Sequence, residues 1–267
     1  MKSSNANLML SIIIISIAFV LTGSSVMAAG PNEHVVKLKE AVRQADLKFD
    51  RDLYIKAHAD CERILAAEPE NTAAEYYLTY TEYKLLLIGM MNKEKSAFTN
   101  YYSAALEHAG NLSDDKEYRS EGLTLQAAIN MMKLAANPNE GPSLAPKIHE
   151  LLDKAENDNP DNPRVYIIRG HMLKNTPEFF GGSLKGAIKE FKYAVSIFEE
   201  GTNPKSEVSP EWGHLEALVE IGNIYSVLGD YKSAKEAYEK ALEVEPDYVY
   251  VKFRLLPELE QKISSSN

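Results

Sequence analysis

The residue types that most often carry chemistry are sparse in this sequence and poorly grouped. His58 and Cys61 lie three positions apart, so on a helix they would share a face and could touch one metal ion. His149-Glu150 lacks the second histidine of a metalloprotease helix, and the segment Gly181–Gly186 lacks the spacing of a phosphate-binding loop. No serine sits in a nucleophile elbow. The sequence therefore predicts no catalytic residue, no metal and no cofactor, and hence a protein that is not an enzyme.

The elements that must position the remaining candidates are helices. Apolar residues recur at helical spacing nearly throughout, and no stretch alternates as a strand does. Pro and Gly residues interrupt this pattern at separated points and divide the chain into helices of roughly 12 to 18 residues. Short helices joined by short turns are typical of helical hairpins.

A repeat of such a hairpin is clearest at residues 215–248. Gly222 and Ala234 are small where two antiparallel helices must approach, and Tyr238 fills the space around that contact. Gly229 suits the turn, and Pro246 ends the second helix. This segment resembles the tetratricopeptide repeat at nearly every signature position, with Leu218 in place of the usual Trp and Tyr238 in place of the usual Phe.

Further copies precede this one. Residues 163–200 repeat the pattern with Gly170, Ala187 and Phe191, but the turn is enlarged by five residues into a loop. Weaker hairpins are predicted from residue 33 onward, and residues 110–155 match least well. We expect one domain over residues 29–267, an all-α, right-handed solenoid of four to five antiparallel hairpins with a C-terminal capping helix. Because Cys61 occupies the position where this repeat packs an aromatic side chain, a buried structural thiol is favoured over a metal ligand.

Candidate partner-binding residues are those predicted to line the concave surface of the solenoid. The first helices of stacked hairpins form that surface, and aromatic and arginine side chains tend to anchor binding interfaces. Each candidate has an alternative role, the tyrosines as core residues and the charged residues as a solvated face. The candidates on this surface are Arg164, His171, Lys174, Asn223, Tyr76, Tyr80 and Tyr83.

The enlarged loop of residues 176–182 is a second candidate surface. Phe179 and Phe180 are adjacent in it and are costly to leave in water, so they pack over a neighbouring hairpin or meet a partner, and packing is favoured. The segment from Pro177 to Ala194 is also similar to the periplasmic T-component of TRAP-type solute transporters, over roughly residues 145–200. That resemblance implies an accessory protein that works with a solute-binding protein. The T-component usually carries a lipid anchor, and no cysteine stands near the N-terminus here.

The first 28 residues have the layout of a secretory signal peptide. A lysine precedes the apolar run Leu8–Leu21, and small residues allow cleavage after Ala28. The run is shorter than the roughly 20 residues that cross a bilayer. We therefore expect an exported protein, periplasmic or secreted, with no stable membrane anchor after cleavage.

Composition narrows the class of partner. The formal net charge of −10 argues against nucleic acid and against anionic membrane surfaces. The leading hypothesis is a non-enzymatic exported scaffold that binds a protein or peptide partner through its concave face. The alternative is an accessory component of a solute transporter that docks with a solute-binding protein.

Overall fold

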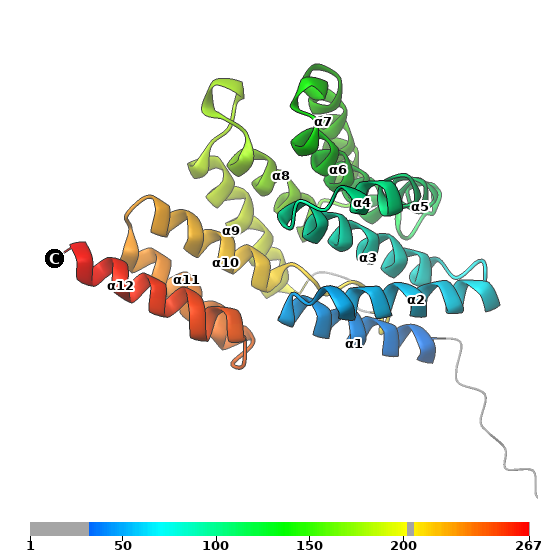
Figure 1. The fold of residues 1–267 in the computed structure, drawn as a ribbon, viewed down its shortest axis with the longest axis horizontal. Coiled ribbons are helices and arrows are strands. Elements are labelled where there is room, and N and C mark those ends of the chain that lie inside the picture. Colours follow the sequence, from blue (N-terminus) through cyan, green and yellow to red (C-terminus); the bar gives the residue numbers. More distant parts are fainter. Residues whose placement is uncertain (1–31, 202–205, 267) are drawn as a thin grey trace, which may run out of the picture.

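The structure is a computed structural model that describes residues 32–201 and 206–266 (Figure 1). Within those ranges the chain is helical and contains no β-strand, and the prediction of an all-α, tetratricopeptide-like solenoid is confirmed. The described helices pair as five antiparallel hairpins, the upper end of the predicted number, and a terminal helix follows them. The predicted signal peptide lies outside the described residues.

Each hairpin has a first and a second helix. The first helices are α1 (Glu33–Lys48), α3 (Thr72–Met91), α6 (Arg119–Ala136), α8 (Pro163–Asn175) and α10 (His214–Val227). The second helices are α2 (Arg51–Ala67), α5 (Ser103–Asp114), α7 (Gly141–Asp158), α9 (Leu184–Glu200) and α11 (Tyr231–Val244). Shorter elements are α4 (Lys95–Ala97) and the π-helical η1 (Phe98–Tyr102) before α5, the 3-10 turns η2 (Pro138–Glu140) and η3 (Glu178–Phe180), and the π-helical η4 (Val251–Leu255) before the terminal α12 (Leu256–Ser266).

Side-chain caps fix the starts of several helices. Asp50 accepts hydrogen bonds from the first-turn N–H groups of α2, and Asn71, Asn162, Ser183 and Asp230 do the same for α3, α8, α9 and α11. Such caps satisfy backbone donors that the helix itself leaves unpaired.

Small residues allow the two helices of a hairpin to approach closely. A Cβ atom added at Gly222 would lie 2.3 Å from the ring of Tyr238, and one added at Gly170 would lie 2.8 Å from the ring of Phe191. The glycines of the two clearest repeats therefore make room for an aromatic ring on the second helix, as the sequence predicts.

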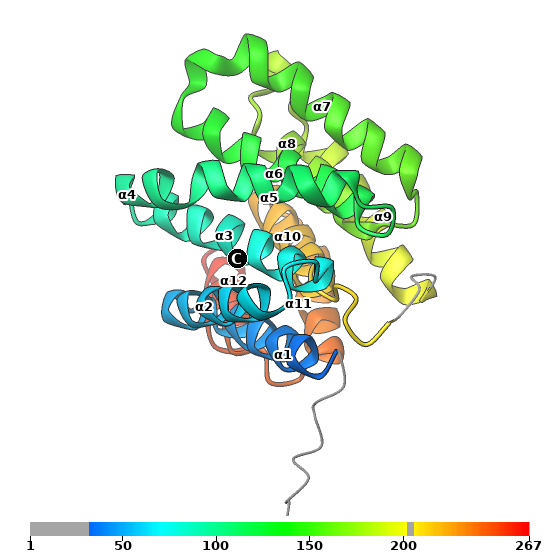
Figure 2. The same cartoon turned by 90° about the vertical axis from the view of Figure 1, so that its right-hand side faces the viewer.

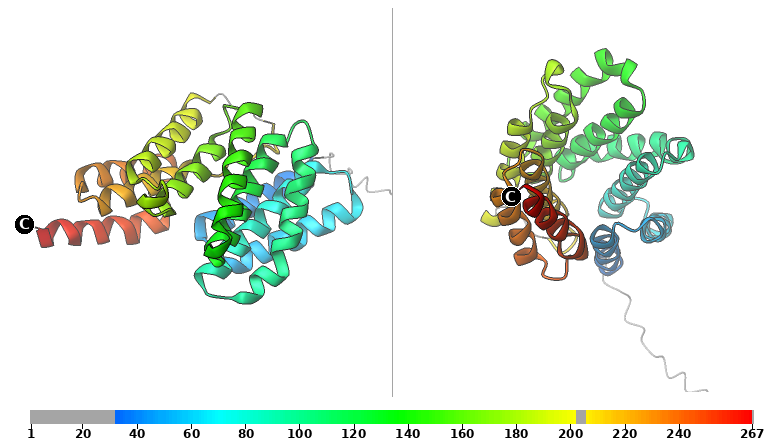
Figure 3. Two further views of the ribbon diagram at one scale, coloured as in Figure 1. Left: turned by 90° about the horizontal axis from the view of Figure 1, so that it is seen from above. Right: turned by 60° about the vertical axis from the view of Figure 1, so that its left-hand side comes forward.

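The solenoid curls until its first and last hairpins meet. Arg43 of α1 pairs with Glu245, at the end of α11, at 3.1 Å, although the two residues are 202 positions apart. Figure 2 and the right panel of Figure 3 show the molecule from two sides, and in both views the last hairpin projects next to α1. The first helices consequently face one another around a common interior.

One expectation about the enlarged loop is wrong. Phe179 and Phe180 do not pack over a neighbouring hairpin: their exposed fractions are 90% and 74%, and their rings contact each other edge to face. A tight turn causes this, because η3 ends at Gly181 with φ of +92° and the backbone N–H of Gly182 returns to the carbonyl of Pro177. In the described ranges, no helix is long and apolar enough to cross a membrane.

Candidate functional site

Side chains from the first helices of all five hairpins meet on one surface, which we call the inner face. It is formed by α1, α3, α6, α8 and α10. Most of the residues that the sequence predicts to line a concave surface lie here. They are joined to one another by hydrogen bonds and ion pairs in two clusters and one charged seam.

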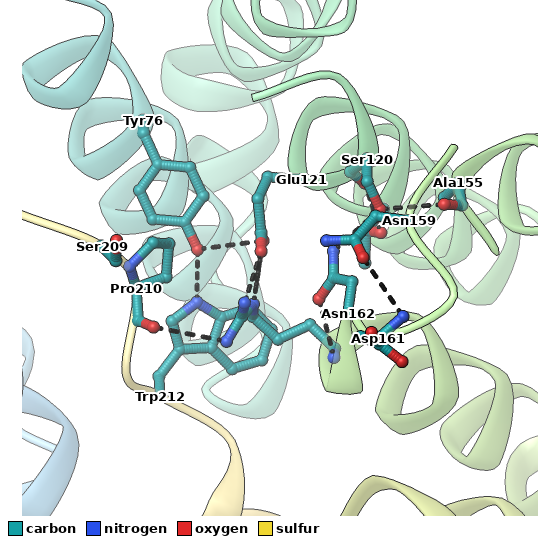
Figure 4. Close-up of polar contacts among 12 residues, drawn as sticks. Tyr76, Ser120, Glu121, Ala155, Asn159, Asp161, Asn162, Ser209, Pro210 and Trp212 are labelled. Atoms are coloured by element: carbon teal, nitrogen blue, oxygen red, sulfur yellow. Dashed lines mark hydrogen bonds and ion pairs between the residues drawn. The ribbon is translucent and has the colours of Figure 1, made fainter. Parts of the chain in front are cut away.

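The first cluster surrounds Arg164 on α8, whose exposed fraction is 2%. Its guanidinium forms a bidentate pair with Glu121 of α6, with Nε at 2.7 and 2.9 Å from the two carboxylate oxygens. The Tyr76 hydroxyl donates to Glu121 at 3.4 Å and accepts from the indole N–H of Trp212 at 2.6 Å (Figure 4). Burial has the largest single effect on the pKa of Arg164 and lowers it. The charge and hydrogen bond of Glu121, together with Tyr76 and Tyr77, outweigh burial and raise that pKa, so the guanidinium keeps its charge.

Local structure holds Arg164 in this position. The Asn162 side chain caps α8 by accepting from the backbone N–H of Arg164, and its amide donates to the Ser120 hydroxyl at 3.0 Å. Ser120 in turn donates to the carbonyl of Ala155 at 2.9 Å. Because Ser120 and Glu121 are neighbours on α6, these contacts fix the start of α8 against the helix that carries its counter-ion.

The second cluster surrounds Asp46 on α1. Its carboxylate accepts from the hydroxyls of Tyr54 at 2.5 Å and Tyr80 at 2.8 Å, and the Lys84 ammonium lies 3.5 Å away. Loss of water raises the pKa of Asp46, and the charge of Lys84 offsets part of that rise. Lys84 also lies 5.6 Å from the centre of the Tyr80 ring, so its charge is shared between a carboxylate and an aromatic face.

A seam of charged side chains joins α8 to α10. His171 Nε2 lies 2.7 Å from Glu216, and Lys174 lies 2.5 Å from Glu220, so the two pairs are about one helical turn apart. All four side chains are partly exposed. The seam therefore presents paired but accessible charges at the inner face.

We expect Glu216 to make the fold less stable as the pH falls. Burial has the largest single effect on its pKa and raises it, but the charge of Lys84 and the hydrogen bond to His171 outweigh burial and lower that pKa from 4.5 to about 2. A carboxyl whose folded pKa is depressed contributes stability above its unfolded pKa, and that contribution is lost as the pH falls from about 4.5 through about 2.

We therefore predict that Glu216→Gln flattens the acid limb of the stability curve. The difference in unfolding free energy between wild type and variant should shrink by about 1–3 kcal/mol between pH 5 and pH 2, measured by urea denaturation at each pH. Replacing the exposed Glu200 is the control, and it should leave the limb unchanged. An acid limb with the same slope in wild type and Glu216→Gln would contradict the depressed pKa.

The predicted inner-face residues fall into two groups. Tyr76, Tyr80 and Tyr83 are buried in the core, which is the alternative role expected for them from the sequence. Arg164 is buried with them. His171 and Lys174 are partly exposed on the seam, whereas Asn223 accepts a hydrogen bond from Tyr238 within its own hairpin at 2.7 Å. A role in partner contact remains a prediction for each of them.

Sequence reasoning missed four residues that organise the inner face: Asp46, Lys84, Glu121 and Trp212. Three are charged residues that the structure buries wholly or largely, and a charge at a helical position is usually solvated. Trp212 is the chain's one tryptophan and lies between two helical patterns, in a stretch that follows Pro204 and Pro210. Those features were the available signal that Trp212 has a structural role.

His58 and Cys61 do not lie together at an open site. Cys61 is fully buried, and loss of water raises the pKa of its thiol, which agrees with a structural role. His58 instead faces a hollow of about 400 Å³ with Glu82 and His108, where Glu82 lies 3.5 Å from His58 and 2.9 Å from His108. Over the described ranges, no group of three or more His, Cys, Asp or Glu side chains has an arrangement that could hold a metal ion.

Comparisons with known proteins agree with this architecture. Residues 215–248 match the family model of the tetratricopeptide repeat. The solved structure of a thermophilic TPR protein from Thermus thermophilus is 20% identical, with a TM-score of 0.57 over 83% of this chain and 98% of that one. The HusA haemophore from Porphyromonas gingivalis is 23% identical, with a TM-score of 0.57 over 75% of this chain and 95% of that one. No curated protein matches the sequence.

These findings define the class of protein. The chain carries a tetratricopeptide repeat at its C-terminal end, and the whole described fold is a helical repeat scaffold of the kind that generally serves protein–protein interaction.

Proposed function

We propose that this chain is an exported, non-enzymatic scaffold that binds a protein or peptide partner through its inner face. The observation that carries the proposal is the charged seam between α8 and α10. Two polar side-chain pairs, His171–Glu216 and Lys174–Glu220, join these neighbouring first helices, and all four side chains are partly exposed to solvent. Accessible, ordered charges of both signs suit recognition of a polar partner and add specificity more than raw affinity.

The loop that follows α8 offers exposed aromatic side chains. Phe179 and Phe180 lie within six residues of Lys174 in the sequence and expose their rings to solvent. Exposed aromatic side chains are typical of an interaction site, because a partner can bury them and remove their contact with water.

Affinity capture from an envelope extract tests the proposal. We expect a specific partner to co-purify with the wild-type protein, and His171→Ala with Lys174→Ala to lower its affinity about tenfold or more, because the double change removes the imidazole and the ammonium group of the seam. The control is Lys232→Ala with Lys235→Ala on α11, which also truncates two polar side chains but away from the inner face. Equal affinity of wild type and the His171/Lys174 variant would mean that the seam is not the binding site.

The identity of the captured partner distinguishes the transporter alternative from the general scaffold. An accessory protein of a solute transporter should hold a solute-binding protein in a stable complex. The name of the haemophore states the role of that protein, and its structural similarity to this chain shows a shared fold. A partner other than a solute-binding protein would favour the general scaffold.

A further inference from the structure

The connection between α9 and α10 is unusually long for this fold. Elsewhere in the described ranges, the second helix of one hairpin is joined to the first helix of the next by four residues. These connections are Glu68–Asn71, Asp115–Tyr118 and Asn159–Asn162. The connection from α9 to α10 spans residues 201–213, so it has 13 residues. Its described part, Ser206–Gly213, crosses the inner face, and we call it the strap. Because four residues can join these repeats, the extra length of the strap needs another explanation.

The strap is bound through its backbone as a peptide ligand would be. Lys39 of α1 donates to the carbonyl of Glu207 at 3.1 Å, and the Tyr77 hydroxyl of α3 donates to that of Val208 at 3.0 Å. Arg164 of α8 reaches the carbonyl of Pro210 at 3.5 Å. Three first helices thus supply donors to nearby carbonyl groups of one short segment that is built from turns. Backbone contacts of this kind hold a segment irrespective of its side chains.

Side chains of the strap add selectivity. The Trp212 indole donates its N–H to Tyr76 (Figure 4). The same indole stacks on Tyr80 with ring centres 4.8 Å apart and lies 5.9 Å from the Arg164 guanidinium. Glu211 pairs with Lys39 at 2.6 Å. An aromatic anchor in a pocket of aromatic and arginine side chains is the arrangement found at the energetic centres of protein interfaces.

We propose that the strap is an intramolecular occupant of a peptide-binding site, and that the partner enters this site with a segment bearing a tryptophan preceded by an acidic residue. The proposal rests on the proposed function and specifies its partner. The recognised chemistry is that of the strap itself: carbonyl groups for Lys39 and Tyr77, a carboxylate for Lys39, and an indole for the pocket of Tyr76, Tyr80 and Arg164. A tethered strap competes at a high effective concentration, so a partner segment must displace it.

The test uses the strap sequence as a free peptide. Residues 206–212 are replaced in the chain by a Gly-Ser linker of equal length, which keeps Gly213 because its φ of +113° and its closeness to Ile167 suit glycine. The probe is the capped peptide SEVSPEW. Since Trp212 is the chain's one tryptophan, the peptide then carries the sole indole in the sample, and its fluorescence anisotropy reports binding directly.

We expect saturable one-to-one binding to the strap-replaced protein, and binding to the wild type at least tenfold weaker, with calorimetry used for the wild type because it carries its own indole. Tyr77→Phe in the strap-replaced protein should weaken binding several-fold, because it removes one hydroxyl donor. A peptide with Ala in place of Trp should not bind, as followed by calorimetry. Circular dichroism checks the fold, and if the linker variant does not fold, Trp212→Ala serves as the acceptor with the same probe.

Two results would overturn the proposal: a folded acceptor that does not bind the peptide, or equal binding by acceptor and wild type, which would place the peptide elsewhere. Neither result bears on capture of a partner through His171 and Lys174. The proposed function therefore stands or falls by its own experiment.

Discussion

Arg164→Met should destabilise the fold by about 3–5 kcal/mol, because it leaves the buried carboxylate of Glu121 without its counter-ion. A loss of this size is a large fraction of the roughly 5–15 kcal/mol that typically holds a folded domain together. Urea denaturation followed by circular dichroism measures it.

A second change should restore most of that loss. Glu121→Met in the Arg164→Met background removes the orphaned charge, and the double variant should lie within about 2 kcal/mol of wild type. Arg254→Met is the matched control, since Arg254 pairs with Glu258 on the surface and such pairs contribute about 0–1 kcal/mol. If Arg164→Met costs no more than Arg254→Met, Arg164 does not form the buried pair described above.

The second large effect is expected at Gly122, where α5 and α6 cross. A Cβ atom at this position would lie 2.4 Å from the backbone nitrogen of Ser113 and 2.7 Å from the carbonyl carbon of Leu112. Backbone atoms cannot turn aside as a side chain can, so the helices must separate. Gly122→Ala should therefore cost about 2–3 kcal/mol, measured by thermal or urea denaturation.

Gly110 provides the matched control for this prediction. It lies on α5, and a Cβ atom there would have no neighbour within 4 Å. Gly110→Ala should stabilise the chain by about 0.5–1 kcal/mol, because alanine favours a helix over glycine. Stabilisation by both substitutions would show that α5 and α6 are not in close contact at Gly122.

The sequence predicts most of the helices because their ends carry local signals. Asn162 and Pro163 start α8, Asp230 starts α11, and Gly222 faces Tyr238 at the spacing that the repeat requires. These interactions join residues a few positions or one hairpin apart. They recur with the repeat, so one well-formed copy helps to predict the others.

Contacts between distant hairpins leave no such signal. Trp212 donates a hydrogen bond to Tyr76, which is 136 positions away in the sequence, and Arg43 donates one to Glu245, which is 202 positions away. Neither pairing follows from the periodicity of the sequence. Phe179 and Phe180 show a different limit: their apolar character predicts packing, but the local turn at Gly181 leaves their rings exposed. The prediction of the inner face therefore located Arg164 and His171 without the partners that they contact.

Site-specific photo-crosslinking tests the central claim, that partners bind at the inner face, most directly. A benzophenone side chain placed at Val227, which is exposed on α10 about two helical turns after Glu220, is compared with one placed at Lys232, whose side chain on α11 is 89% exposed. After irradiation in an envelope extract, we expect the probe at position 227 to form a discrete covalent complex and the probe at position 232 to form none. A complex that forms only from position 232 would contradict binding at the inner face.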